Sequence, residues 1–347
     1  MLKIATILPY KENYTFIAAA AASLWVCDFF KYTKFKKNNY IFGSTDTKDY
    51  LTKNYINIKI DNIDSKFSST TTLYCNKLIK KIKNKKFDII EIHNRPLVFN
   101  YLYNKLNSKF ILYFHNDPIS MKGSKTVKER LKLLNDISKI IFVSKWVQKR
   151  FFIGLDQKLI NQTSVVYPSI DKDSKLVKKE KRIVFVGKLN ESKGYDIYRD
   201  AIIKILDQHP NWKAFSIGDE RRNKPIIVHK NHTELGYLKH NEVLDFLKKS
   251  EIAVVPSRWE EPFGRTALES SSRGCATIIS NRGGLPETTD YAIILKNLNK
   301  NDLHREINNL IVNKKLRQSY QTKGFNNVKH LTKDNSRYID YIRDSLS

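Results

Sequence analysis

The sequence has few cysteines, glycines and prolines, and it has no long apolar run. Of its 347 residues only 3 are Cys, 12 are Gly and 9 are Pro. Cys27, Cys75 and Cys275 lie far apart and form no CxxC pair, which argues against a disulfide framework or a zinc site. The most apolar stretch, residues 16–30, contains polar residues and is shorter than the roughly 20 residues that cross a bilayer. We expect a cytoplasmic protein, either free or peripheral on the inner face of the cytoplasmic membrane.

Acidic residues are scarce relative to basic ones. The chain has 62 Lys and Arg but 35 Asp and Glu, a formal net charge of +27, of which residues 1–168 carry +17. Such a surface attracts polyanions, including an anionic membrane. Only 15 of the basic residues are Arg, the type preferred for base contacts, so nucleic acid is not an expected partner. Drift towards Lys, Asn and Ile in an AT-rich coding sequence stays open as the alternative to membrane attraction.

Short apolar runs alternate with longer, polar segments of helical character. Runs of four to six residues rich in Ile, Val and Phe are typical of buried parallel strands, and helices between them indicate βαβ units. The runs occur at residues 4–8, 89–92, 110–114, 140–143, 164–167, 183–186, 214–217, 252–255 and 277–279. The pattern predicts an α/β protein with doubly wound parallel sheets.

The alternation stops once, near residues 167–170. A charged stretch follows there, and the next strand begins at Arg182. We predict one domain over residues 1–168 and a second over residues 169–330, which suits a chain of this length. A C-terminal helix at about 331–347 could pack back on the first domain.

The strongest motif follows the expected strand at 252–255. Residues 256–269 read PSRWEEPFGRTALE, so a proline-containing loop leads into a helix that begins near Gly264. The free amides and the positive dipole end of a helix start suit an anion or a polar ligand. Glu261 lies in the loop and Glu269 about two turns into the helix, which lets the two carboxylates hold two ends of one ligand. Taken alone, paired glutamates are also common on solvated surfaces.

The whole string resembles the E-x7-E signature of the retaining glycosyltransferases of family 4, which have the GT-B fold. Glu261 and Glu269 match its two glutamates, and the Gly-Gly-x-x-Glu turn at 283–287 follows at the family's distance. Upstream, residues 185–194 (FVGKLNESKG) resemble the family's F-V-G-R-L…K-G segment, with Lys188 in place of the usual arginine. Two further segments, SIGD at 216–219 and LGYL at 235–238, resemble turns of the family's donor-binding domain.

This resemblance implies two Rossmann-like domains that face a central cleft, the first on the acceptor side and the second binding the donor. It implies transfer of a sugar from a nucleotide-sugar donor with retention of configuration. UDP is the expected nucleotide by family frequency, and the expected acceptor is a cell-envelope glycolipid or polysaccharide such as lipopolysaccharide. No cofactor and no metal are expected, because cations and helix dipoles stabilise the diphosphate in this fold.

The resemblance also implies roles for residues of the second domain. Glu261 would hold a donor-sugar hydroxyl, Glu269 the ribose hydroxyls, and Lys188 and Lys193 the diphosphate. The remaining expected donor contacts lie in the turns and at the helix start: Gly187, Gly218, Tyr237, Phe263, Gly264 and Arg265.

The first domain matches the family less well. His115 ends the expected strand at 110–114 and fits the family's histidine beside the donor sugar, so we place it with Lys188, Lys193 and Glu261 among the catalytic residues. His93 and Arg95 end another strand, and they stay between an acceptor-side role and a structural one. The first loop has no glycine where family members often have two, so its role is not carried over.

Three other functions stay open. A non-catalytic protein with a degenerate site is disfavoured by the intact pairs of glutamates and lysines. A sugar-nucleotide epimerase of the same architecture is disfavoured by the E-x7-E string. A basic nucleic-acid binder would show a steep salt dependence with DNA and would not bind sugar nucleotides.

Overall fold

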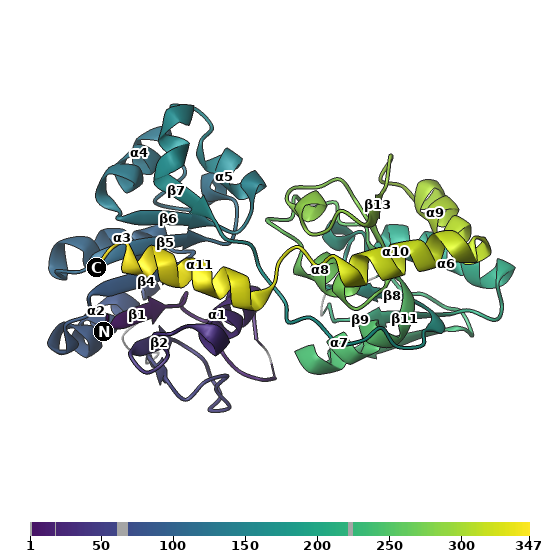
Figure 1. The fold of residues 1–347 in the computed structure, drawn as a ribbon, viewed down its shortest axis with the longest axis horizontal. Coiled ribbons are helices and arrows are strands. Elements are labelled where there is room, and N and C mark those ends of the chain that lie inside the picture. The colour runs from purple at the N-terminus through teal and green to yellow at the C-terminus, as the bar shows by residue number, and fades with distance from the viewer. Residues whose placement is uncertain (1, 18, 61–68, 221–224) are drawn as a thin grey trace. The chain divides into compact units, whose positions relative to one another are not determined.

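The computed structural model describes residues 2–17, 19–60, 69–220 and 225–347. The chain divides into two compact units (Figure 1). The first unit consists of residues 1–169 and 332–347, and the second of residues 170–331. The chain therefore returns to the first unit for its last helix. The acceptor and donor roles of the two units stay predictions.

The first unit is built on a seven-stranded sheet with the strand order β3-β2-β1-β4-β5-β6-β7. All neighbouring strands are parallel. Their bounds are β1 (Ile4–Ile7), β2 (Asn39–Gly43), β3 (Tyr55–Asn57), β4 (Ile89–His93), β5 (Lys109–Phe114), β6 (Lys139–Phe142) and β7 (Thr163–Val165). The strand order reverses between β1 and β4, and ligands of such sheets bind beyond the carboxyl ends of the strands at that point.

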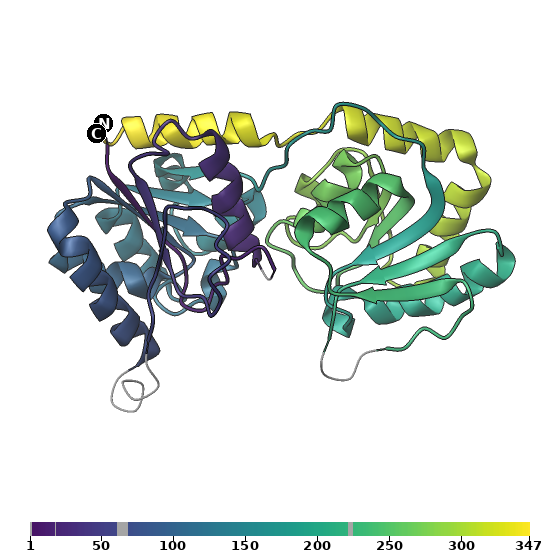
Figure 2. The ribbon, with the colours of Figure 1, turned by 90° about the horizontal axis from the view of Figure 1, so that it is seen from below.

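Helices cover both faces of this sheet (Figure 2). On one face α1 (Ala21–Tyr32) and α11 (Thr332–Asp344) pack together over a core that includes Trp25, Phe29 and Ile339. The opposite face is covered by α2 (Thr70–Ile82), α3 (Pro96–Leu102), α4 (Val127–Asp136) and α5 (Lys145–Phe151). Because both faces are covered, the central strands are mostly apolar, and the buried exceptions include Thr6 and Glu91, which hydrogen-bond to each other.

The second unit has a six-stranded parallel sheet in the order β10-β9-β8-β11-β12-β13. The strands are β8 (Glu180–Val186), β9 (Lys213–Ile217), β10 (His232–Gly236), β11 (Ser250–Val255), β12 (Ala276–Ile279) and β13 (Ala292–Ile294). The helices are α6 (Tyr195–Gln208), α7 (His240–Lys249), α8 (Arg265–Ser272), α9 (Lys300–Val312) and α10 (Lys314–Asn326). The order reverses between β8 and β11, so the loops after these two strands lie at the expected ligand edge.

Short 3-10 helices complete the connections. They are η2 (Lys83–Lys85), η3 (Tyr103–Lys105), η4 (Pro118–Ser120), η5 (Gln157–Gln162), η6 (Glu191–Lys193) and η7 (Leu285–Glu287).

The two parallel sheets confirm the predicted α/β class with doubly wound sheets. Each of the nine apolar runs overlaps a strand. The strands β2, β3, β10 and β13 were not among those runs; three of them are edge strands, where alternation with polar residues or short length weakens the apolar signal. Within the ranges that the structure describes, no helix combines the length and apolar character needed to cross a membrane.

Candidate functional site

The loop after β8 brings Lys193 against Glu261. Lys193 ends η6, whose first turn is capped by the side chain of Asn190. Nζ of Lys193 donates to Oε1 of Glu261 at 2.5 Å and lies 4.6 Å from the centre of the Trp259 ring. Glu261 is 8 % exposed, so its carboxylate is largely shielded from water. The structure thus brings together the two predicted residues from separate motifs, whereas Lys188 is exposed on the same loop.

Close backbone contacts hold these loops in place. Gly194 has φ 71°, and a Cβ there would lie 1.9 Å from the carbonyl oxygen of Pro256 in the loop after β11. Gly283 has φ 57°, and a Cβ there would lie 2.1 Å from the carbonyl oxygen of Glu261. Only glycine fits at either position, because both the backbone conformation and the space exclude a side chain. The Gly-Gly turn therefore positions the backbone of Glu261.

Glu269 is held by two donors at the centre of α8. Its Oε1 accepts from Nε2 of His240 at 2.8 Å and from Nε of Arg265 at 2.6 Å. Burial acts to raise the pKa of Glu269, but Arg265 and His240 outweigh it and lower the pKa to about 2. The carboxylate is therefore anionic at neutral pH. Because His240 and Arg265 both donate to Oε1, Oε2 is the oxygen better suited to accept from a ligand.

The other predicted donor contacts lie at the same edge of the sheet or next to it. The amide of Gly187 donates to Ile217 O at 2.9 Å, and that of Gly218 donates to Gly236 O at 2.8 Å, so the turns after β8, β9 and β10 lie side by side. Tyr237 follows β10 and is 58 % exposed.

The start of α8 is built from Phe263, Gly264 and Arg265. Phe263 is buried with its ring 5.5 Å from that of His330, and Gly264 is the N-cap with φ 99°. Gly264 offers no side-chain cap to the first turn of the helix. Such a helix start suits polar ligand groups, and donor binding there stays a prediction.

In the first unit, His93 and His115 form a pair across neighbouring strands. Nδ1 of His93 lies 2.8 Å from Nε2 of His115. His93 is 1 % exposed, whereas His115 is half-buried at the carboxyl end of β5. Arg95 is exposed and donates to the carbonyl oxygen of Asn94 at 3.0 Å. His93 was expected to have either an acceptor-side role or a structural role, and its burial favours the structural role.

Sequence reasoning did not identify His240, Trp259 and Arg343. Trp259 adjoins the glutamates in the loop after β11, and its position in the motif could have indicated it. His240 lies 29 residues before Glu269 and contacts it through the packing of α7 on α8. No local pattern indicates such a contact.

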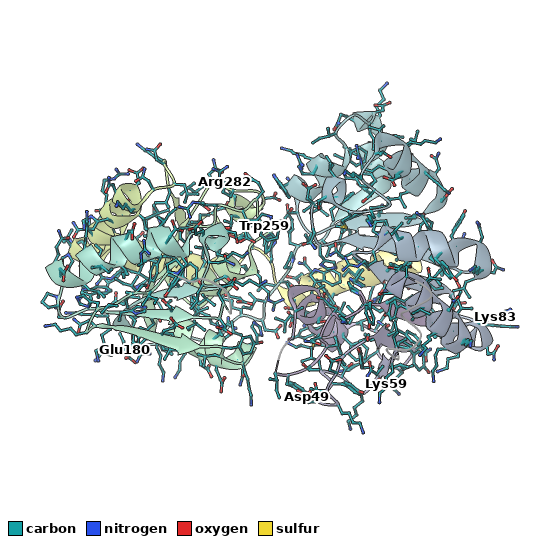
Figure 3. The ribbon with its side chains drawn as sticks, turned by 180° about the vertical axis from the view of Figure 1, so that it is seen from behind. Asp49, Lys59, Lys83, Glu180, Trp259 and Arg282 are labelled. Atoms are coloured by element: carbon teal, nitrogen blue, oxygen red, sulfur yellow. The ribbon has the colours of Figure 1, made fainter. Side chains whose placement is uncertain are left out.

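Figure 3 shows Trp259 and Arg282 at one end of the second unit, with Glu180 away from both.

Among the described residues, no group of three or more His, Cys, Asp and Glu side chains is arranged to hold a metal ion. Metal-independent transfer stays a prediction.

The chain has clear sequence relatives. Residues 166–327 match the family described as "Glycosyl transferases group 1". The uncharacterized glycosyltransferase MJ1178 of Methanocaldococcus jannaschii is 33% identical over 294 residues, which cover 79% of this chain and 81% of that protein. Spore coat protein SA of Bacillus subtilis is 24% identical over 243 residues, 60% of this chain and 64% of that protein. The match to spore coat protein SA thus spans slightly less than two thirds of the length of that protein.

Solved structures share the fold. The crystal structure of Anabaena HepE (Alr3699) in complex with UDP and glucose aligns with a TM-score of 0.78 at 15% identity, covering 99% of this chain and 100% of that one. The apo form of the lipopolysaccharide outer core galactosyltransferase WaaB aligns with a TM-score of 0.70 at 14% identity, covering 99% and 100%. The two Rossmann-like parallel-sheet units are those of the GT-B fold. The chain belongs to the group 1 glycosyl transferase family.

Proposed function

We propose that this chain is a retaining glycosyltransferase of family 4. It transfers a sugar from a UDP-sugar to a hydroxyl group of a cell-envelope glycolipid or polysaccharide such as lipopolysaccharide. The observation that carries the proposal is the contact between Lys193 and Glu261 at the carboxyl edge of the second sheet. It joins the two motifs, E-x7-E and the K-G segment, on which the resemblance rests. Support for the donor comes from HepE, which was crystallised with UDP-glucose.

The proposed chemistry assigns separate tasks to the cations and the carboxylates. The barrier lies in departure of the diphosphate from an oxocarbenium-like sugar carbon. Lys188 and Lys193 stabilise the charge that develops on the departing diphosphate, and donors that are already in place do so at little reorganisation cost. Glu269, anionic because of Arg265 and His240, accepts from the ribose hydroxyls. The proposed transfer uses no divalent metal.

The sugar itself is held by Glu261 and His115. Glu261 accepts from a sugar hydroxyl near the anomeric carbon, and His115 contacts the donor sugar. The acceptor attacks from the side of the leaving phosphate, which retains the configuration. We do not assign Glu261 the role of a covalent nucleophile.

A membrane-bound acceptor is supported by the charge of the chain. Residues 1–168 carry +17 of the net charge of +27. Anionic lipid attracts basic protein surfaces at about 1 kcal/mol for each Lys or Arg near the membrane. We therefore propose that the protein works at the inner face of the cytoplasmic membrane. The WaaB likeness is compatible with a lipopolysaccharide acceptor.

Calorimetric binding of UDP-, GDP- and ADP-linked sugars, without added metal, tests the donor site. We expect one nucleotide class to bind the wild type and to bind the Glu269→Ala variant far more weakly. Glu180→Ala is the matched control, because Glu180 is exposed at the opposite end of β8. Equal binding by the Glu269→Ala variant would refute the ribose role, and binding by no donor would refute a preformed donor site.

A further inference from the structure

The bond to His93 occupies Nε2 of His115, and the protonation of the other ring nitrogen, Nδ1, depends on His93. The bond between Nδ1 of His93 and Nε2 of His115 is 2.8 Å long and joins two imidazoles. Burial, with His93 beside it, holds the pKa of His115 well below its usual range. Burial, with a smaller effect of Arg343, lowers the pKa of His93 to about 3. Both rings are therefore neutral at pH 7, and each carries a single proton.

Only two arrangements of those protons make the bond. In the first, Nδ1–H of His93 donates to His115, and the proton of His115 is on Nδ1. In the second, Nε2–H of His115 donates to His93, and the proton of His93 is on Nε2. The two arrangements give His115 opposite properties, because its outward nitrogen is a donor in the first and an acceptor in the second.

The surroundings of His93 decide between the arrangements. Its ring stacks on Tyr113 at 4.4 Å and 3°, and the edge of Trp25 closes on it at 5.4 Å. Within the described part of the chain, Nε2 of His93 is buried and has no hydrogen-bond partner. A proton on that atom would be a buried donor without an acceptor, which folded proteins rarely tolerate.

Arg343 helps to keep the ring of His93 neutral. Its guanidinium lies close enough to lower the pKa of His93. Arg343 and His93 also line one small cavity, together with Trp25. A cation there disfavours a second proton on His93, which would make the ring positive, and so keeps one of its nitrogens bare. Glu91 cannot reverse this preference, because both its oxygens already accept, Oε1 from Tyr113 and Arg343 and Oε2 from Thr6 and Arg343.

We propose that His93 is a positioning residue that holds His115 in the Nδ1–H tautomer, so that His115 donates a hydrogen bond to a ligand oxygen and does not act as a base. This inference rests on the proposed function for the identity of the ligand, a donor-sugar oxygen. The position of His115 is set as well: Oδ1 of Asn94, a residue with φ 56°, accepts from the amides of His115 and Asn116 at 3.2 Å each.

The tautomer can be read directly. We expect long-range 1H–15N correlation spectra of 15N-histidine-labelled protein at pH 7 to show hydrogen on Nδ1 and a bare Nε2 in His115, assigned with the His115→Phe variant. Hydrogen on Nε2 of His115 in the wild type would overturn the proposal. This result does not depend on activity, so it decides the proposal even if no sugar nucleotide binds and the proposed function fails.

Two variants of His93 test the link to the ligand. His93→Phe keeps a ring against Tyr113 but removes the donor, and we expect His115 to lose its Nδ1–H preference. His93→Gln keeps an N–H donor and should retain the preference. Circular dichroism and urea midpoints establish that each variant folds, and the wild-type spectrum decides the proposal if either does not.

Calorimetry with UDP-glucose separates positioning from a merely structural role. We expect about tenfold weaker binding in His93→Phe, the loss of one hydrogen bond. In the His115→Phe background the same substitution should change binding by less than about twofold, because His93 acts through His115. Equal losses in both backgrounds would show that His93 only supports the fold and would overturn the proposal.

Discussion

Nζ of Lys193 lies 2.5 Å from Oε1 of Glu261, although 68 positions separate the two residues in the chain. They meet because β8 and β11 are neighbours in the sheet and both loops leave its carboxyl edge. The side chain of Lys193 is 25% exposed and that of Glu261 is 10% exposed, so the contact is partly shielded from solvent. Because the ammonium of Lys193 has three N–H donors, it can keep this contact while it donates to a diphosphate.

Replacing Lys193 should slow transfer strongly. Loss of one donor aimed at developing negative charge typically lowers kcat about 10²–10³-fold. We expect a loss of this size in Lys193→Ala, measured as UDP release from UDP-glucose with a glycolipid extract as acceptor. Lys204→Ala, an exposed lysine on α6, is the control and should leave the rate unchanged. A loss of less than tenfold in Lys193→Ala would contradict a role at the diphosphate.

Glu269 should make folding stability depend on acid pH. Its pKa of about 2 lies below the ordinary value of 4.5, so its contribution is fully present above about pH 4.5 and is lost as the pH falls towards 2. The contribution amounts to about 3 kcal/mol at most. We expect the difference in unfolding free energy between the wild type and Glu269→Gln to shrink by up to that amount between pH 5 and 2.5. A difference independent of pH in urea titrations would count against the lowered pKa.

The buried pair of Arg343 and Glu91 should anchor α11 to the first unit. Arg343 donates to both oxygens of Glu91 at 2.8 Å, and the side chains are 6% and 2% exposed. Removing one partner of a buried pair typically costs about 3–5 kcal/mol, because the other charge stays buried. We expect that loss in Arg343→Met and a smaller loss when Glu91→Gln is added, both measured by urea unfolding.

Arg337 on the same helix provides the matched control for Arg343. Its side chain is 68% exposed, so Arg337→Met should change the free energy of unfolding by less than about 0.5 kcal/mol. Equal effects of the two arginine substitutions would contradict the anchoring role.

The excess of positive charge should appear as membrane binding. We expect the protein to float with liposomes in proportion to their anionic lipid, and to dissociate as salt rises from 0.05 to 0.5 M, because salt screens exposed charges. Liposomes of neutral lipid are the control. If binding changes with neither the lipid charge nor the salt concentration, the net charge of +27 reflects drift in an AT-rich coding sequence.

The central strands and the motif loops were predictable from local sequence. Strands covered on both faces are mostly apolar, and the runs at Ile4–Ile7 and Ile252–Val255 show it, with Thr6 as the one polar residue in the two. The glycines at 194 and 283 were visible as letters of motifs, and the structure shows why they are needed, since a Cβ at either would overlap a backbone oxygen.

The edge strands and the side-chain partners were not predictable in the same way. β10 reads HTELG and is exposed along part of its length, so its apolar content is low. His240 reaches Glu269 only because α7 packs on α8, and spacing along one chain does not encode that packing. His93 was left between two roles because burial is a property of the folded chain.

The sequence by itself determined the α/β class, the place of nine strands along the chain, and the place of the glutamate and lysine motifs in the loops after two of them. These features depend on local patterns, because apolar runs and turn residues act within a few positions of each other. Only the tertiary structure decided that Lys193 meets Glu261, that Arg265 and His240 keep Glu269 anionic, and that Arg343 lies beside His93. Such contacts join residues 4 to 250 positions apart, and the physical reason is that helix packing and strand order bring them together in space.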